Sequence, residues 1–247
     1  MNLEKYQQYS RIARGLEKAD LVLKDARIVN VFTEEIIRGD IAIQDGIIAG
    51  IGSFHGKEER DLAGRYVCPG FIDSHLHLES TLVTPAELVT AASRHGTTTF
   101  IVDPHESANV SGLAGVDYIL DQTENVKANV YVMMPSCVPA TSIDDNGCTL
   151  TAEDMAPYLH NSRILGLGEV MDSISVVQGE KSMHDKLELF EGRIRDGHAP
   201  FLEEGDLQAY AMAGIATDHE CSFFDYAMRE RRNGLTILVR EGSAARN

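Results

Sequence analysis

Two histidines end an apolar run in the first third of the chain, where residues 69–79 are P-G-F-I-D-S-H-L-H-L-E. Alternate side chains of a β-strand share one face, so we expect Asp73, His75 and His77 to point the same way. Two imidazoles at a strand end can bind one metal ion from one side, and imidazole is a ligand for zinc, iron and manganese. For this stretch alone, a His-Leu-His that is merely packed or exposed is an open alternative.

Further polar residues follow later apolar runs in the same manner. After Val67, seven predicted strands alternate with helices, which indicates a parallel sheet. An open doubly wound sheet and a (β/α)8 barrel both begin this way. The strand ends favour the barrel, because residues at the carboxyl ends of its strands converge at one rim. The candidate site residues are His75 and His77 after the first strand, Asp103, His105 and Glu106 after the second, Glu169 after the fourth, His198 after the fifth and His219 after the sixth.

The segment before this alternation has a different pattern. Residues 1–18 look helical, with Leu3, Tyr6 and Ile12 as apolar contacts. Residues 21–67 hold short β runs, two of them joined by an Asp-Gly hairpin signal. The short runs and the hairpin predict a small antiparallel, β-sandwich-like unit.

The chain is therefore expected to have two domains. Residues 1–67 would form the N-terminal helix and the small β unit, and residues 68–247 would form a TIM-type (β/α)8 barrel that holds strands 1 to 7. Inside the barrel, Thr151 and Asp154 predict a capping box, and a helix is expected over about 186–195.

Composition narrows the classes of function. With 247 residues and 43% hydrophobic residues, the chain can bury a sizeable core. The net charge of −16 argues against binding to nucleic acid or to anionic membranes. The sequence has no apolar run long enough to span a bilayer and no apolar signal-peptide core. We expect a cytoplasmic protein without disulfides, because no C-x-x-C pair joins Cys68, Cys137, Cys148 and Cys221.

The motifs resemble a known family. The P-G-F-I-D-S-H-L-H run, with single histidines on later strands, is similar to the metal-dependent amidohydrolase superfamily, and the similarity covers essentially the whole chain. The zinc motif of the cytidine-deaminase type, which combines H-x-E with P-C-x-x-C, is absent because the sequence has no P-C-x-x-C. Four stretches resemble the bacterial adenine deaminases of the superfamily: D-P-H-E at 103–106, G-L-G-E-V-M at 166–171, D-G-H-A at 196–199 and R-E-G-S-A at 240–244.

The resemblance implies a binuclear centre of Mn²⁺ or Fe²⁺. His75 and His77 would bind the more buried metal, Glu169 would bridge the two metals in place of a carboxylated lysine, and His198 and His219 would hold the second metal. Metal-activated hydroxide would attack C6 of adenine and give hypoxanthine and ammonia, a step of purine salvage.

The sequence leaves two roles open for the residues after the second predicted strand. Asp103, His105 and Glu106 would contact the purine or transfer protons, or they would serve only as supporting hydrogen-bond groups. Both assignments stay open at the level of sequence.

One departure from the family pattern concerns length. Family members are longer and have an eighth barrel strand whose aspartate binds metal and moves protons. We therefore expect this chain to be the N-terminal part of such an enzyme, impaired when alone and prone to associate as a homo-oligomer through unpaired strand edges. Another cyclic amidohydrolase of the superfamily, or a remnant without catalysis, is the alternative.

Overall fold

The computed structural model describes residues 1–141, 143–242 and 246, and its contacts divide the chain into two compact units. The first unit is Met1–Pro69 and the second is Gly70–Asn247, so the division falls two residues after the expected boundary. The two units are considered separately below. The last residues of the R-E-G-S-A stretch, 243 and 244, lie outside the described residues.

The first unit is one helix and a five-stranded sheet. Strand β1 pairs antiparallel with β2 and parallel with β4 and β5, and β2 pairs antiparallel with β3. The prediction of a purely antiparallel unit was therefore wrong. Asp45 and Gly46 have φ angles of 50° and 75°, as a tight hairpin between β2 and β3 requires. The elements are α1 (Leu3–Ala13), β1 (Ala19–Asn30), β2 (Glu35–Gln44), β3 (Ile47–Gly52), β4 (Gly56–Asp61) and β5 (Tyr66–Val67).

The N-terminal helix is shorter than predicted and buries only Ile12 of the three side chains expected to make apolar contacts. Helix α1 ends at Ala13, and it packs Tyr9 and Ile12 into the unit. Leu3 and Tyr6 are exposed, so the expectation that they make apolar contacts was wrong. Which side of the helix faces the sheet depends on how the sheet folds, so the helix sequence alone does not determine it.

The second unit contains the seven predicted strands. Five of them form a parallel sheet in the order β10-β9-β8-β7-β6, and β11 and β12 form a parallel pair. The amide of Ala216 donates to the carbonyl of Arg195 at 2.9 Å, so the chain entering β11 continues beside β10. The strands are β6 (Phe71–Leu76), β7 (Thr97–Val102), β8 (Asn129–Met134), β9 (Ile164–Val170), β10 (Ile194–Gly197), β11 (Thr217–Asp218) and β12 (Thr236–Ile237).

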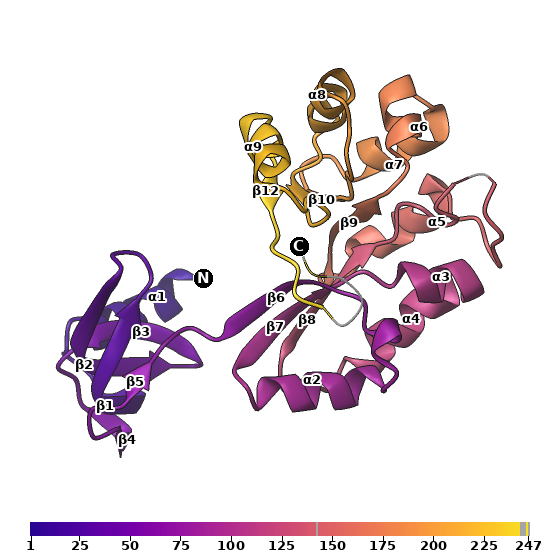
Figure 1. The fold of residues 1–247 in the computed structure, drawn as a ribbon. Coiled ribbons are helices and arrows are strands. Elements are labelled where there is room, and N and C mark those ends of the chain that lie inside the picture. The colour runs from indigo at the N-terminus through magenta and orange to yellow at the C-terminus, as the bar shows by residue number, and fades with distance from the viewer. Residues whose placement is uncertain (142, 243–245, 247) are drawn as a thin grey trace. The chain divides into compact units, whose positions relative to one another are not determined.

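Helices cover the outer side of this sheet, as Figure 1 shows. Apolar side chains of the strands, such as Phe100, Val132 and Leu167, pack in one continuous core with helix residues such as Ile119 and Leu187. Burial of this apolar surface is the main stabilising term of such a layer. The helices are α2 (Pro85–Ser93), α3 (His105–Ser111), α4 (Leu113–Gln122), α5 (Ala152–Met155), α6 (Ser173–Gln178), α7 (Lys181–Leu189), α8 (Glu204–Met212) and α9 (Phe224–Arg232), with short 3-10 turns η1 (Glu79–Thr81) and η2 (Ala156–His160).

In the second unit, one local sequence signal predicted the structure correctly and another did not. Thr151 and Asp154 form the predicted capping box at the start of α5. The helix predicted over 186–195 was wrong: α7 ends at Leu189, and Gly192, with a φ of 77°, turns the chain into β10. A strand forms in place of the last helical turns because β10 completes its hydrogen bonds by pairing with β9, which is a long-range interaction.

The parallel sheet is strongly curled, which gives part of a TIM-type barrel. In a flat sheet the edge strands β6 and β10 would lie four spacings apart, or about 19 Å. Yet the Nδ1 atom of His75 on β6 lies 2.9 Å from Oδ2 of Asp196 on β10. Two side chains can meet in this way only when the sheet curves around them.

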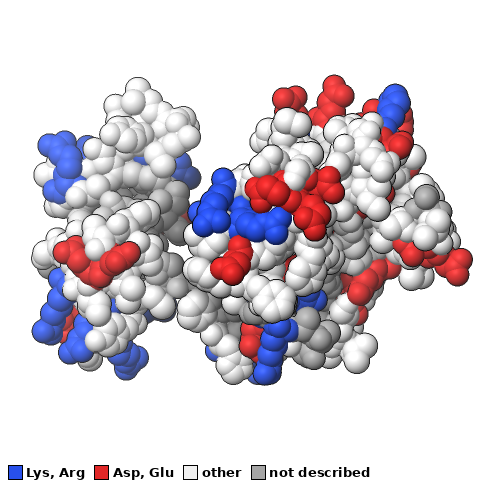
Figure 2. Space-filling model, turned by 45° about the horizontal axis from the view of Figure 1, so that its top comes forward, with Lys and Arg blue, Asp and Glu red and all other residues white. Residues whose placement is uncertain are grey.

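Two surface properties bear on the expected partners. On the face in Figure 2, Lys and Arg side chains are interspersed with Asp and Glu and do not form one broad basic surface. Among the described residues, no helix combines the length and the apolar character that crossing a membrane requires.

The packing of the outer layer predicts a contrast between two isoleucines. Ile119 in α4 is fully buried, whereas Ile174 in α6 is 66% exposed. Ile119→Ala should lower the free energy of unfolding by about 2–5 kcal/mol, because it removes buried methyl groups and leaves a cavity. Ile174→Ala should change it by less than about 0.5 kcal/mol. Urea unfolding followed by circular dichroism measures both, and equal effects would contradict the assigned core.

Candidate metal centre

The carboxylate of Glu169 lies at the centre of a cluster of histidines. Glu169 is the penultimate residue of β9 and is 3% exposed. Its two oxygens face imidazoles that come from different strand ends, so residues far apart in sequence meet around one carboxylate. Oε1 lies 2.6 Å from His75 Nε2, 3.0 Å from His77 Nε2 and 3.4 Å from His219 Nε2, and Oε2 lies 3.5 Å from His198 Nδ1 and 3.9 Å from His105 Nδ1.

The electrostatics of the cluster follow from this crowding. Burial alone would raise the pKa of Glu169, but contacts with His198, His75 and His77 outweigh it and hold that pKa well below its usual range. Burial opposes the charged form of His75, yet its contacts with Asp196 and Glu169 raise its pKa to about 10. The cluster thus favours positive charge around a buried anion, which is the environment that a cation would also satisfy.

Strand β6 delivers the first two histidines. The Nε2 atoms of His75 and His77 are 3.2 Å apart, so the predicted shared face is confirmed. His77 Nδ1 contacts the backbone carbonyl of Asp103 at 2.8 Å. A carbonyl only accepts hydrogen bonds, so this contact places a proton on Nδ1 and leaves Nε2 directed at Glu169.

The next residues are fixed by a side-chain contact that reaches past β8, from the end of β7 to the backbone of β9. Oδ2 of Asp103, at the end of β7, accepts a hydrogen bond from the backbone amide of Glu169 at 2.7 Å. A Cβ atom on Gly168 would collide with this carboxylate. Only glycine leaves room for it, which gives the G-L-G-E sequence a structural reason.

The fifth and sixth strand ends are held by buried polar groups. The amide of His198 donates to the hydroxyl of Tyr210 at 3.0 Å, and that hydroxyl donates to the carbonyl of Val170 at 2.6 Å. Asp218 accepts hydrogen bonds from the amides of Ala199 and Glu220 at 2.7 and 2.8 Å. Backbone on both sides of His198 and His219 is therefore anchored.

The residues present fit a metal centre with more than one ion. Three groups of potential ligands share Glu169, and within each group the ligand atoms lie within 4.8 Å of one another. Among the described residues, Nδ1 of His105, Nδ1 of His198 and Oδ1 of Asp103 are buried without a hydrogen-bond partner. Such atoms are costly unless a ligand satisfies them, and imidazole with carboxylate is a donor set that manganese, iron and zinc accept. The three groups are His75, His77 and Glu169; Glu169, His198 and His219; and Asp103, His105 and Glu169.

Glu106 is the one predicted site residue that lies apart from the cluster. Its side chain is exposed on α3 and contacts the hydroxyl of Ser80. The carboxylate of Asp103 is buried and accepts a hydrogen bond from the backbone amide of Glu169.

Two carboxylates near the histidines were not predicted. Asp196 contacts His75, and Glu220 lies 3.8 Å from His198 Nδ1 and 3.6 Å from His219 Nε2. Arg240 forms an ion pair with Glu220. Asp196 alternates with His198 as Asp73 does with His75, and this spacing was the signal that could have identified it.

A cavity of about 510 Å³ opens on the histidines. Its lining includes His75, His77 and His219, together with Asp73 and Arg240. The volume is in the range of small-molecule sites, and both walls carry charged groups. A small polar ligand would therefore have access to this side of the cluster.

The sequence model of the amidohydrolase family matches residues 66–241. The chain belongs to the amidohydrolase family. Adenine deaminase of Desulfitobacterium hafniense (strain Y51) is 58% identical over 247 residues, which are all of this chain and 43% of that protein. Adenine deaminase of Clostridium acetobutylicum is 50% identical over 95% of this chain and 42% of that protein. The chain thus spans less than half the length of these relatives.

Solved structures agree on the fold. N-acyl-D-glutamate deacylase of Bordetella bronchiseptica matches 90% of this chain and 58% of its own chain, with a TM-score of 0.58 and 16% identity. Beta-aspartyl dipeptidase of Fervidobacterium islandicum matches 90% of this chain and 64% of its own, with a TM-score of 0.59 and 13% identity. At this identity the likeness concerns the fold alone, and it agrees with the predicted barrel type.

The packing of Gly168 generates a prediction with a matched control. Gly168→Ala places a methyl group against the Asp103 carboxylate, so it should lower the free energy of unfolding in metal-free buffer by about 1–3 kcal/mol. Gly205, in α8, has open space around its α-carbon, and Gly205→Ala should be neutral or stabilising by up to about 1 kcal/mol. Urea unfolding measures both variants. A neutral Gly168→Ala would refute the tight contact between β7 and β9.

Proposed function

We propose that this chain is the metal-binding part of an adenine deaminase, which converts adenine and water to hypoxanthine and ammonia. The observation that carries the proposal is the buried Glu169 carboxylate with imidazoles facing both of its oxygens. Such an arrangement suits two metal ions that share one carboxylate. The identity of 58% to an adenine deaminase over the whole chain supports adenine as the substrate.

The residues that would hold the metals follow from the distances. His75, His77 and His219 face Oε1 of Glu169, and His198 faces Oε2; His198 and His219 form one group of possible ligands with Glu169 and would hold the second metal. Manganese or iron(II) suits this mixture of imidazole and carboxylate. When bound, such ions lower the pKa of a water molecule and so supply a nucleophile at neutral pH.

The remaining residues orient these groups and transfer protons. The Asp103 carboxylate fixes the backbone of Glu169, and its carbonyl fixes the ring of His77. His105 Nδ1 lies 3.9 Å from Glu169 Oε2, beyond direct hydrogen-bond distance, so a role in proton transfer at the metal site would act through one water molecule. Glu106 points elsewhere, so we assign the proton-transfer role at this rim to His105 and not to Glu106.

The substrate would enter by the cavity that His75, His77 and His219 line. The cavity is large enough for a purine base, and Arg240 in its lining, which pairs with Glu220, offers donors for ring nitrogens. We also propose a cytoplasmic location. The four cysteines are unpaired, as in a reducing compartment.

A chimera tests this function. Residues 1–247 would replace the aligned residues of the Desulfitobacterium hafniense adenine deaminase, which matches the chain over its full length. Loaded with Mn²⁺, the chimera should release ammonia from adenine and form hypoxanthine, followed by absorbance and chromatography. Glu169→Gln in the chimera should lower kcat/KM by several orders of magnitude, because one carboxylate oxygen that faces the imidazoles is replaced by an amide that cannot bridge metals.

Controls separate the alternatives. Glu106→Gln in the same chimera should retain most activity, since this side chain is exposed and apart from the cluster. A folded chimera that binds Mn²⁺ and hydrolyses another cyclic amide but not adenine would assign the chain to a different amidohydrolase. A folded chimera that binds no metal would contradict the proposal altogether.

A further inference from the structure

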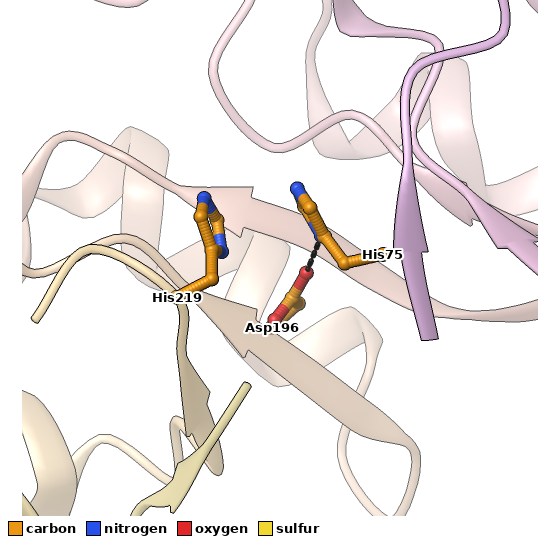
Figure 3. Close-up of side chains that lie close together, drawn as sticks. All are labelled: His75, Asp196 and His219. Atoms are coloured by element: carbon orange, nitrogen blue, oxygen red, sulfur yellow. Dashed lines mark hydrogen bonds and ion pairs between the residues drawn. The ribbon is translucent and has the colours of Figure 1, made fainter. Parts of the chain in front are cut away.

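Asp196 connects three strands at the floor of the histidine cluster. It is 4% exposed, and its Oδ2 lies 2.9 Å from Nδ1 of His75, as Figure 3 shows. Its Oδ1 accepts a hydrogen bond from the amide of Gly197 at 3.1 Å and contacts the hydroxyl of Thr217. Strand β11 thus helps to hold the Asp196 carboxylate of β10 so that it points toward His75 on β6.

We propose that Asp196 is a positioning residue that fixes the ring orientation and the proton position of His75. The inference deepens the proposed function, because it rests on His75 being a metal ligand. An ionised carboxylate only accepts hydrogen bonds, so the proton must lie on Nδ1 of His75. With Nδ1 occupied by that proton, Nε2 is the nitrogen left for a metal ion, and it faces Oε1 of Glu169 at 2.6 Å.

The two histidines of β6 are fixed by different means. His77 uses the backbone carbonyl of Asp103 as its acceptor, which no substitution of that side chain removes. His75 uses the side chain of Asp196. Asp196 is therefore the group through which the proton position of a β6 histidine can be changed without touching the histidine.

The surroundings of Asp196 determine what an asparagine would do there. The amide of Gly197 is a donor and cannot accept, so the side-chain oxygen of an asparagine must face it. Its NH₂ group would then face His75 Nδ1 and donate to it. The ring then keeps its proton on Nε2, the nitrogen that faces Glu169, and has none on Nδ1, although size and shape are nearly unchanged.

The experiment compares Asp196→Asn with the matched exchange Asp206→Asn, at an exposed position in α8. Mn²⁺ binding to the purified chain is measured by calorimetric titration, and the ¹⁵N shifts of the metal-free protein report which nitrogen of His75 carries the proton. Asp196→Asn should weaken binding at one site by about 10–100-fold, which is typical for loss of the acceptor behind a ligand histidine. Nδ1 of His75 should carry a proton in the wild-type protein and lose it in Asp196→Asn, while Asp206→Asn should leave both readouts unchanged.

Several outcomes would overturn the proposal. One is unchanged Mn²⁺ affinity in Asp196→Asn, and another is an unprotonated Nδ1 of His75 in the wild-type protein. If Asp196→Asn does not fold, Thr217→Val, which removes one donor and keeps the carboxylate, must still weaken binding measurably or the role fails. A wild-type chain that binds no Mn²⁺ but has the Nδ1 proton would refute the proposed function and retain the role of Asp196 in holding the ring.

Discussion

The buried carboxylate of Glu169 is the constraint on which the barrel part of the structure depends. An ionised carboxylate inside a protein costs several kcal/mol unless opposite charge and hydrogen bonds surround it. Here the compensation comes from imidazoles at the ends of the first, second, fifth and sixth strands. The site therefore exists only when these strands are in register. Their polar ends come together most favourably when a positive charge lies between them.

The curvature of the sheet follows from the same requirement. His75 and Asp196 belong to the two edge strands of the five-stranded sheet and meet at 2.9 Å. Gly168 leaves room on β9 for the Asp103 carboxylate, which reaches the backbone of Glu169 from the end of β7. Small residues and buried acids are thus placed where the sheet must bend, and the outer helices supply the apolar layer that keeps it bent.

The sequence predicted this centre better than it predicted the elements around it. Strand ends are marked locally, by apolar runs that stop at a polar residue, and the geometry of a barrel then brings His75, Glu169 and His219 together. Boundaries such as that of β10 depend on pairing with β9, which no local pattern contains. The mixed pairing of β1 was missed for the same reason.

Local sequence patterns also could not predict which residues contact the site residues. Asp196 and His75 are separated by 121 positions, and their contact arises from the curl of the sheet. Glu220 directly follows His219, yet its relevance comes from an ion pair with Arg240. Conversely, Glu106 lies next to His105 in sequence but points away from the cluster, because α3 begins there and turns successive side chains to different faces.

The central claim is that Glu169 bridges two metal ions, and crystallography with anomalous scattering tests it most directly. Crystals grown with Mn²⁺ would be measured at a wavelength where manganese scatters anomalously. The account predicts two peaks, one beside His75 and His77 and one beside His198 and His219, with one oxygen of Glu169 on each. A single peak, or peaks that leave Glu169 without a metal contact, would contradict it.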